Sequence, residues 1–309
     1  MNSLKLIIIG GGPAGMTASI YASRYKIPHL ISSSFVGGLA KEAHMVENWP
    51  GIEQIEGSAL MDRFWKHAQS YNPEFQLGEV KRVEKTENGF RVFFSDKLFF
   101  EAPSLIFAGG TQHRGLSISG EKELLGRGVS YCATCDAGFF KGKKVAVIGG
   151  ANSAIMATVE LSQHVDKIYL IYRGKELKGE TIWIDRVKNN PKVILVPETN
   201  ILEIAGTSKV EKIKLDKPFK GEDQIELDGV FIEIGVTPLV DLLKELAVDL
   251  DESGSIKINN KGMTNLSGLF AAGDATNGSG GFRQIITASA EGAIASRGVF
   301  EYLKEKGVL

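Results

Sequence analysis

The sequence has few cysteines, no long apolar run and no excess of charge of one sign. Its 309 residues include two cysteines, which are too few for a disulfide-stabilised scaffold. The 36 basic and 37 acidic residues give a net charge of −1, which argues against nucleic acid or an anionic membrane as the main partner. The first apolar run, residues 4–9, is short and ends in glycines, so we expect neither a signal peptide nor a membrane span. We therefore expect a cytoplasmic protein.

Two patterns of strand, glycine-rich turn and helix stand out instead. The first contains GGGPAG, in which Gly10, Gly12 and Gly15 fit the dinucleotide-binding spacing G-x-G-x-x-G. The second, KKVAVIGGANSA, has Gly149 at the first of these positions but Ala151 at the second, where a pyrophosphate approaches most closely. Taken alone, the first pattern is also compatible with a plain glycine-rich turn. Together with the length, the two patterns predict an α/β fold with two Rossmann-like, three-layer ββα nucleotide-binding domains.

A third glycine-rich segment lies near the end of the chain. A short apolar strand ends in Gly273 and Asp274, and RQI then opens a helix of small residues. Asp274 is placed to accept a hydrogen bond from a ribose or ribitol hydroxyl, while the helix N-terminus offers amide donors. The alternative is that Asp274 is a loop residue or a helix cap.

The two cysteines lie close together, in YCATCD. A zinc site needs about four ligands, and the five scattered histidines do not supply them, so we expect no metal. In a chain with dinucleotide folds, the spacing of Cys132 and Cys135 indicates a redox pair. Asp136 follows directly and is a candidate acid and base for thiol–disulfide exchange, the alternative being a helix N-cap.

The combination of GGGPAG, ENWPG, GRGVSY, YCATCD, AAGDA and RQI resembles low-molecular-weight thioredoxin reductases over essentially the whole chain. This resemblance implies a flavoprotein with a discontinuous FAD-binding domain, residues 1–112 and 245–309. Residues 113–244 would form an NAD(P)H-type domain that carries the redox disulfide. A homodimer and a thioredoxin or thioredoxin-like partner are also implied.

The resemblance implies that glycine-rich turns from both segments of the FAD domain hold the cofactor. The expected FAD-binding residues are Gly10, Gly12, Pro13, Ala14, Gly15, Ser32, Ser33, Gly37, Gly38, Leu39, Asn48, Val80, Ala108, Gly109, Gly273, Asp274, Arg283, Gln284 and Ile285. Ser32 and Ser33 stand where a flavoprotein often has an acidic residue for the ribose. Leu39 follows the two glycines where the family usually has glutamine. Asn48 would approach the isoalloxazine ring.

The resemblance also assigns roles to the redox pair. Electrons would pass from reduced FAD to the disulfide, with Cys135 facing the flavin and Cys132 attacking the disulfide of the partner. Asp136 would protonate the departing thiolate. Because one cysteine pair cannot face a buried flavin and an external protein at once, we expect the middle domain to rotate.

The electron donor is less well defined. NADPH-using members have a cluster of the form HRRxxxR, whose arginines grip the 2′-phosphate. This chain reads YRGKELK, so Arg173 remains while Gly174 and Lys178 replace the other two arginines. The pattern resembles members, many of them archaeal, that use NADPH poorly or take electrons from deazaflavin or ferredoxin. The alternative is that Arg173, Lys175 and Lys178 still form a weak NADPH site.

Two other classes of function stay open at this point. An FAD-dependent dithiol oxidase has the same fold and a C-x-x-C pair, but it passes electrons from a small dithiol to oxygen. A binding or scaffold role would require a degenerate reductase without cofactor. The intact CATCD motif argues against that role.

Overall fold

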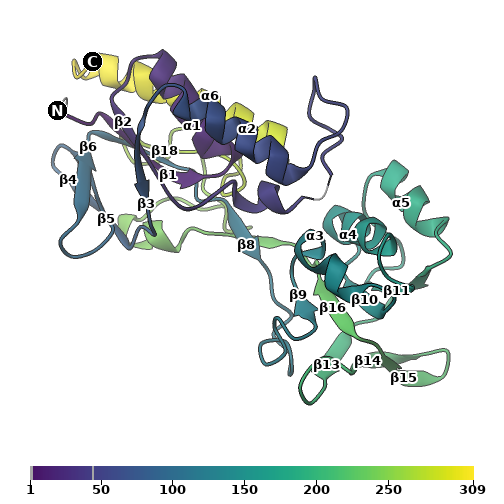
Figure 1. The fold of residues 1–309 in the computed structure, drawn as a ribbon. Coiled ribbons are helices and arrows are strands. Elements are labelled where there is room, and N and C mark those ends of the chain that lie inside the picture. The colour runs from purple at the N-terminus through teal and green to yellow at the C-terminus, as the bar shows by residue number, and fades with distance from the viewer. Residues whose placement is uncertain (1–2, 44) are drawn as a thin grey trace. The chain divides into compact units, whose positions relative to one another are not determined.

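The computed structural model describes residues 3–43 and 45–309, which form two compact units (Figure 1). Unit 1 consists of the chain up to Gln112 together with Thr237–Leu309, and unit 2 consists of His113–Val236. Each unit is built around a parallel sheet, as the two strand, turn and helix patterns predict.

The chain passes between the units through two short strands. These strands, β8 (Thr111–His113) and β17 (Val236–Pro238), pair as a two-stranded sheet. The chain returns to unit 1 at Thr237, earlier than the boundary expected after residue 244, because the residues that follow β17 belong to unit 1. Leu239 N donates to Gly110 O at 3.0 Å, and Leu243 packs in a core cluster of unit 1.

Unit 1 contains a five-stranded parallel sheet with the order β18-β7-β1-β2-β3. Its strands are β1 (Leu6–Gly11), β2 (His29–Val36), β3 (Glu74–Leu77), β7 (Ser104–Phe107) and β18 (Leu269–Ala271). The central strand β1 is apolar along its length because both of its faces are covered, which is typical of a parallel sheet. The carboxyl ends of β1, β7 and β18 bring the glycine-rich turns together.

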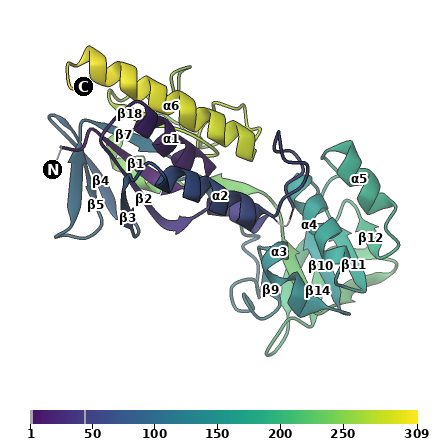
Figure 2. The same cartoon turned by 45° about the horizontal axis from the view of Figure 1, so that its top comes forward.

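Successive side chains of β1 point into different layers. Leu6 and Ile8 pack against helices, whereas Ile7 and Ile9 pack against an antiparallel sheet on the other face. The helical layer contains α1 (Pro13–Arg24) and α6 (Ile285–Glu305), with α2 (Gly57–Gln69) beside α1 (Figure 2). The opposite layer consists of β4 (Arg82–Thr86), β5 (Gly89–Phe93) and β6 (Phe99–Ala102). Each fully buried Leu or Ile contributes about 1.5–3 kcal/mol to this core.

Helices α1 and α6 pack closely because small residues line their contact. A Cβ atom on Gly292 of α6 would lie 2.1 Å from the carbonyl oxygen of Ala14 in α1. One turn further on, Ser296 Oγ donates to Ala18 O at 2.6 Å. The contact between Gly292 and Ala14 places α6 against the first turn of α1, beside the glycine-rich turn.

Unit 2 repeats the layered arrangement. Its parallel sheet has the order β12-β11-β10-β16-β9. The strands are β9 (Val129–Ser130), β10 (Lys144–Ile148), β11 (Lys167–Ile171), β12 (Val193–Val196) and β16 (Gly229–Ile232). Val145 and Val147 of β10 face the layer of α4 (Asn152–Ser162), while Ala146 and Ile148 face the opposite layer. Helix α5 (Thr181–Lys188) packs beside α4.

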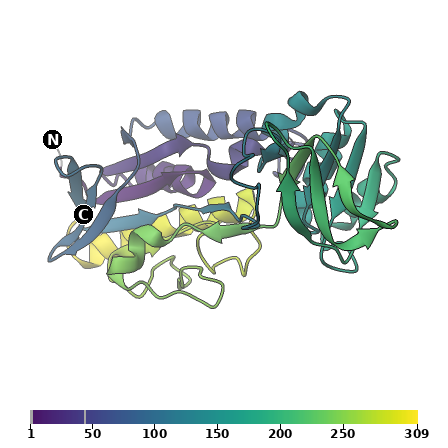
Figure 3. The same ribbon diagram turned by 90° about the horizontal axis from the view of Figure 1, so that it is seen from below.

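The opposite layer of unit 2 is a three-stranded antiparallel sheet (Figure 3). It consists of β13 (Ile201–Ala205), β14 (Lys212–Phe219) and β15 (Glu222–Glu226). Both units therefore have three layers, and the predicted α/β class with two Rossmann-like domains is confirmed. Within the described part of the chain, no helix is both long and apolar enough to cross a membrane.

Candidate active site

The glycine-rich turn of unit 1 joins β1 directly to α1. Gly10 has a φ of +125°, and a Cβ atom there would lie 2.1 Å from Ala108 O. A Cβ atom on Gly15 would lie 1.9 Å from Gly10 O. Because backbone atoms occupy both spaces, only glycine permits this close approach of helix and strand. Pro13 takes the first helical position, where its missing N–H costs nothing.

The N-terminus of α1 faces a second pair of glycines. Its N-cap is Gly12, and neither a side-chain cap nor an acidic residue in the first turn satisfies its amides within the described residues. Gly37 N donates to Gly11 O at 2.8 Å, which brings Gly38 to the same place. A Cβ atom on Gly12 would meet Gly38 Cα at 3.9 Å and no nearer heavy atom. Free amides, glycine surfaces and the positive helix end suit a pyrophosphate.

Several other expected FAD residues lie around this turn. Ala108 N donates to Ile9 O at 2.7 Å, and Gly109 packs against the Phe107 ring. Leu39 belongs to the short helix η1 (Gly38–Glu42) and is half-buried. Val80 is partly buried and packs against the core cluster that contains residues of β1 and β5.

The two serines of β2 are enclosed rather than presented at an open strand end. Ser33 Oγ donates to Phe35 O at 2.6 Å and packs against Gly11. Ser32 is fully buried, and its Oγ has no hydrogen-bond partner among the described residues. An enclosed serine hydroxyl is a weaker hydrogen-bond acceptor for a ribose hydroxyl than an exposed carboxylate would be.

The segment after β18 places Asp274 beside the first turn of α1. Gly273 has a φ of +84°, and a Cβ atom there would lie 2.9 Å from Ala14 Cβ. Burial is the main reason that the pKa of Asp274 is raised to about 6; the Arg283 charge opposes this rise and the Glu291 charge adds to it. The Arg283 Nε donates to the backbone carbonyl of Asp274 at 3.1 Å.

Asn48 and Gln284, which are far apart in sequence, meet at the start of α6. Asn48 Nδ2 donates to Gln284 Oε1 at 3.0 Å. Gln284 is the N-cap of α6 and forms a capping box with Thr287, so Ile285 begins the helix. The structure thus joins the ENWPG and RQI motifs, although no separate spacing in the sequence indicates this contact.

Glu291 is a residue of this site that the sequence analysis missed. It lies on α6 and is only 8% exposed. Its Oε2 accepts from Gly273 N at 2.8 Å and from Thr276 Oγ1 at 2.6 Å. The available signal was an acidic residue within the small-residue segment ITASAEGA, where a buried carboxylate needs partners.

In unit 2, Cys132 and Cys135 form a disulfide with a Cα–Cα distance of 5.3 Å. Cys132 is the N-cap of the single-turn helix α3 (Ala133–Asp136), and its Sγ accepts from Cys135 N at 3.1 Å. Cys132 N bonds the hydroxyl of Ser130, the last residue of β9, at 3.0 Å. Cys135 is exposed and Cys132 is half-buried. The pair therefore follows an edge strand, with Cys135 as its exposed residue.

Asp136 is the last residue of α3 and is half-buried. Its backbone N donates to Cys132 O at 3.3 Å. Its side chain makes no cap hydrogen bond to the following turn, η2 (Ala137–Phe140), within the described residues. The N-cap alternative therefore has no support from a side-chain contact. The proton-transfer role stays a prediction.

A hydrogen-bonded pair next to the disulfide was also missed. Tyr131, directly before Cys132, donates from its hydroxyl to Glu121 Oε1 at 2.6 Å. Glu121 is 2% exposed and also accepts from Leu116 N and Ser117 N. Burial and the Glu121 carboxylate raise the pKa of Tyr131 to about 12, so its hydroxyl keeps the proton.

The second glycine-rich turn differs from the first. Ala151 is the N-cap of α4, and the YRGKELK segment crosses beside it, with Lys178 N donating to Gly150 O at 2.7 Å. Arg173 and Lys178 are exposed, as is Lys175. These cations are available to an anion, but lysine lacks the planar fork that arginine offers to a phosphate. Within the described residues, no group of His, Cys, Asp and Glu is arranged to hold a metal ion.

Comparison with known proteins places this geometry in a family. The family model for pyridine nucleotide-disulphide oxidoreductases matches residues 4–292. The thioredoxin reductase of Bacillus subtilis (strain 168) is 37% identical over 303 residues, which cover 97% of this chain and 95% of that protein.

Solved structures agree with this placement. The chain matches the thioredoxin reductase of Lactococcus lactis with a TM-score of 0.93 and 31% identity, covering 98% of this chain and 100% of that one. It matches the thioredoxin reductase of T. acidophilum with a TM-score of 0.90 and 35% identity, covering 97% and 99%. The chain therefore belongs to the pyridine nucleotide-disulphide oxidoreductases and, within them, to the low-molecular-weight thioredoxin reductases.

Proposed function

We propose that the protein is an FAD-dependent thioredoxin reductase that passes electrons through the Cys132–Cys135 disulfide to the disulfide of a thioredoxin or thioredoxin-like protein. The observation that carries this proposal is the closed disulfide of unit 2, in which Cys135 is exposed. The glycine-rich helix N-terminus and the Asp274 turn in unit 1 support the cofactor assignment.

FAD fits the residues that surround the first glycine-rich turn. The pyrophosphate would take the amides at the N-terminus of α1, between Gly12 and Gly38. Asp274 would accept from the ribityl chain, and Asn48 with Gln284 would hold the isoalloxazine. When bound, FAD would supply two-electron chemistry between the donor and the disulfide.

The disulfide would then carry the electrons in two exchange steps. Two electrons and two protons convert the disulfide into the thiols of Cys132 and Cys135. The Cys132 thiolate attacks one sulfur of the partner's disulfide, forming a mixed disulfide and releasing the other sulfur as a thiolate. The Cys135 thiolate attacks Cys132 Sγ, which restores the intramolecular disulfide and releases the reduced partner.

Asp136 is proposed as the group that moves protons in these steps. It follows Cys135 directly and ends the same helical turn, so it travels with the redox pair. A carboxyl group there can protonate a departing thiolate and take a proton from an attacking thiol. The rotation of the disulfide-bearing unit between flavin and partner stays a prediction that rests on the family resemblance.

A cysteine variant tests the proposal. Cys135→Ser is expected to abolish reduction of the thioredoxin disulfide while FAD remains bound, because the substitution removes the sulfur that closes the cycle. Turnover is followed as loss of the thioredoxin disulfide, and FAD content as the ratio of flavin to protein absorbance. If Cys135→Ser still reduces thioredoxin at the wild-type rate, the assignment is wrong. Hydrogen peroxide formation by the wild type from a small dithiol and oxygen, without thioredoxin reduction, would identify a dithiol oxidase instead.

The donor is proposed to be either weakly bound NADPH or a non-pyridine donor such as reduced deazaflavin or ferredoxin. Arg173, Lys175 and Lys178 supply positive charge near the second turn, but Ala151 narrows the pyrophosphate approach. Glu176 adds a negative charge close to Tyr172, whose pKa is raised by burial and then by this carboxylate.

The donor question is answered by anaerobic mixing of the FAD-loaded protein with NADPH, NADH, reduced deazaflavin and reduced ferredoxin in turn. Bleaching of the flavin absorbance reports electron uptake. We expect NADPH to act slowly and only at high concentration. Fast bleaching at micromolar NADPH would contradict the weakened site. Arg173→Ala tests whether this reduction uses a specific site. If NADPH bleaches the variant at the wild-type rate, the reduction is adventitious and does not depend on Arg173.

The homodimer implied by the resemblance is also a proposal. Exposed apolar side chains follow one stripe at the start of α6 and just before it, with Phe282 58%, Ile286 40% and Ile294 44% exposed. Ile286 and Ile294 lie eight residues apart on α6, which places them on one broad face of the helix, and Phe282 lies just before the helix begins. A second copy of the chain would cover this stripe. Sedimentation of the wild type and of Ile286→Glu tests this, since a charge on the stripe is expected to shift a dimer to monomer.

A further inference from the structure

We propose that Glu291 is a positioning residue for Asp274: it fixes the turn that presents the Asp274 carboxylate to FAD, and its negative charge shifts the pH range in which FAD affinity changes. This inference rests on the proposed function, because it concerns the FAD site of unit 1.

The first part of the argument is the geometry of the turn. One oxygen of Glu291 accepts from both Gly273 N at 2.8 Å and the Thr276 hydroxyl at 2.6 Å. Thr276 N also donates to Gly273 O at 2.9 Å, which closes the turn around Asp274. Glu291 therefore holds both residues that end this turn. A buried carboxylate with two donors is a rigid anchor, since breaking it leaves a buried amide unpaired.

The same anchor reaches the glycine-rich turn. Gly273 faces Ala14 in the first turn of α1, and Gly292, next to Glu291, packs on the Ala14 carbonyl. Loss of the Glu291 anchor would thus disturb Asp274 and the contact between Gly273 and α1 together. Glu291 does not need to touch FAD to affect its binding.

The second part of the argument is charge. Two charged groups influence the Asp274 pKa: the Arg283 guanidinium lowers it and the Glu291 carboxylate raises it. Burial is the largest cause of the raised pKa of Asp274, about 6, and burial also raises the pKa of Glu291. Hydrogen bonds from Thr276 and the Gly273 amide oppose the rise at Glu291. The two carboxyl groups therefore share one buried region and resist being ionised together.

The coupling has a defined direction. An ionised Asp274 accepts a hydroxyl hydrogen bond from the ribityl chain more strongly than a protonated one. FAD affinity is therefore expected to fall as pH is lowered through about 6, the pKa of Asp274. Removing the charge of Glu291 lets Asp274 ionise at lower pH, so the fall in affinity moves to lower pH.

Two variants separate the turn from the charge. Glu291→Gln keeps an amide oxygen that accepts from Gly273 N and from Thr276, but it carries no charge. Glu291→Ala removes the acceptor as well and leaves Gly273 N unpaired. We expect Glu291→Ala to weaken FAD binding by about tenfold or more at pH 8, and Glu291→Gln to weaken it less while moving the pH profile.

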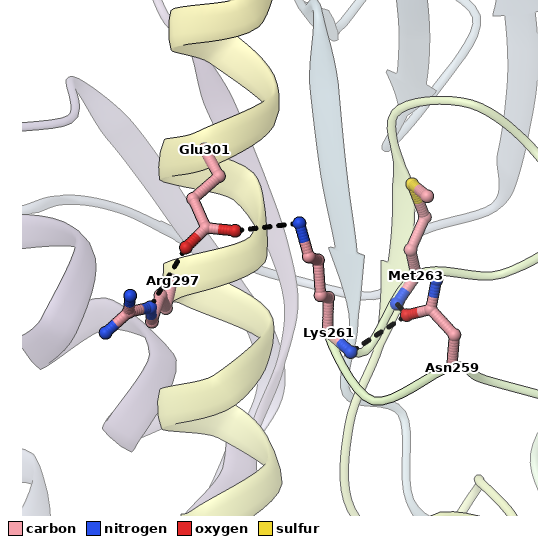
Figure 4. A network of polar contacts seen from close by, with 5 residues as sticks. All are labelled: Asn259, Lys261, Met263, Arg297 and Glu301. Carbon is pink, nitrogen blue, oxygen red and sulfur yellow. Dashed lines mark hydrogen bonds and ion pairs between the residues drawn. The ribbon is translucent and has the colours of Figure 1, made fainter.

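Glu301→Gln is the matched control. Glu301 lies on the same helix α6, where it accepts from Arg297 Nε at 3.0 Å and from Lys261 Nζ at 3.0 Å (Figure 4). Lys261 belongs to a turn held by Asn259 Oδ1, which accepts from Lys261 N and Met263 N. The control thus removes a negative charge from α6 without touching the turn at Asp274.

The experiment measures FAD binding to apoprotein of the wild type and the variants by quenching of FAD fluorescence from pH 5 to pH 8. Circular dichroism checks that each apoprotein is folded. If Glu291→Ala fails to fold, Glu291→Gln carries the test alone. Asp274→Asn is included because it should bind FAD with no pH dependence in this window.

The expected result is a wild-type profile that falls near pH 6, the same profile for Glu301→Gln, and a profile at lower pH for Glu291→Gln. A merely structural role of Glu291 would weaken binding equally at all pH values. If Glu291→Gln and Glu301→Gln have the same profile, the inference is wrong and the flavoprotein proposal stands. If the wild-type apoprotein binds no FAD at any pH, both are wrong.

Discussion

Alanine at Gly12 and alanine at Gly15 each add one methyl group to the glycine-rich turn of unit 1, and the structure predicts opposite consequences. A Cβ atom on Gly15 would lie 1.9 Å from the carbonyl oxygen of Gly10, a backbone atom that cannot move alone. A Cβ atom on Gly12 would meet only Gly38 Cα, at 3.9 Å. The first methyl group collides within the fold, whereas the second enters the space expected for the pyrophosphate.

The magnitudes follow from these contacts. Overpacking costs about 1–3 kcal/mol, and a collision with a backbone atom places Gly15→Ala in the upper part of this range, at about 2–3 kcal/mol. Alanine recovers about 1 kcal/mol as the better helix former, so the expected net loss is about 1–2 kcal/mol. At about 2–4 °C for each kcal/mol, the melting temperature of the apoprotein should fall by roughly 2–8 °C. Gly12→Ala should cost less than about 1 kcal/mol, because Gly12 has an ordinary extended backbone, with φ −83°.

The second unit supports this estimate, since Ala151 already stands at the corresponding N-cap of α4 with φ −105°. Gly12→Ala should nevertheless bind FAD at least about tenfold more weakly, because its methyl group displaces the pyrophosphate. Thermal unfolding of both apoproteins and FAD titration test the pair, with Gly138→Ala as a control at a glycine that has open space. Wild-type FAD affinity in Gly12→Ala would refute the assignment of this turn.

Two further predictions concern stability. The buried His29 bonds Ser19 Oγ and Ile27 O, and burial lowers its pKa, so the unfolded chain binds the proton more readily and stability should fall as pH drops below about 6.5. Urea unfolding at pH 7.5 and pH 5.5 should show a smaller difference for His29→Gln than for the wild type, and an equal difference would contradict this. Tyr131→Phe should destabilise unit 2 by about 1–3 kcal/mol, because the buried Glu121 loses a donor. Tyr169→Phe in the same unit should change the free energy of unfolding in urea little. If it lowers this free energy as much as Tyr131→Phe does, the hydrogen bond between Tyr131 and Glu121 is not the cause of the loss.

The fold was predictable where one local pattern determines one element. The apolar run before Gly10 and the spacing to Gly15 predict a strand, a tight turn and a helix, and these are observed as β1 and α1. The end of unit 2 was not predictable to the residue. Val240 and Leu243 are apolar in either unit, and only their packing in the core of unit 1 assigns them.

The site was predictable where the chemistry lies in adjacent residues and less so where it depends on distant ones. YCATCD predicts a redox pair, and a Cys132–Cys135 disulfide is present, while its redox activity is still a prediction. Glu291 and Glu121 were not predicted, because the sequence around a single acidic residue does not show which buried hydrogen-bond donors contact it in the fold. The burial of Ser32 was hidden for the same reason, since strand neighbours rather than its own segment enclose it.

Anaerobic reductive titration tests the central claim most directly, because it counts the electrons that each bound FAD and the disulfide accept. The wild type and Cys135→Ser are loaded with FAD and titrated with dithionite while the flavin absorbance is followed. If FAD and the Cys132–Cys135 disulfide form one electron path, the wild type takes up about twice as many electrons per FAD as the variant before both are fully reduced. Equal uptake by the two proteins would contradict the account.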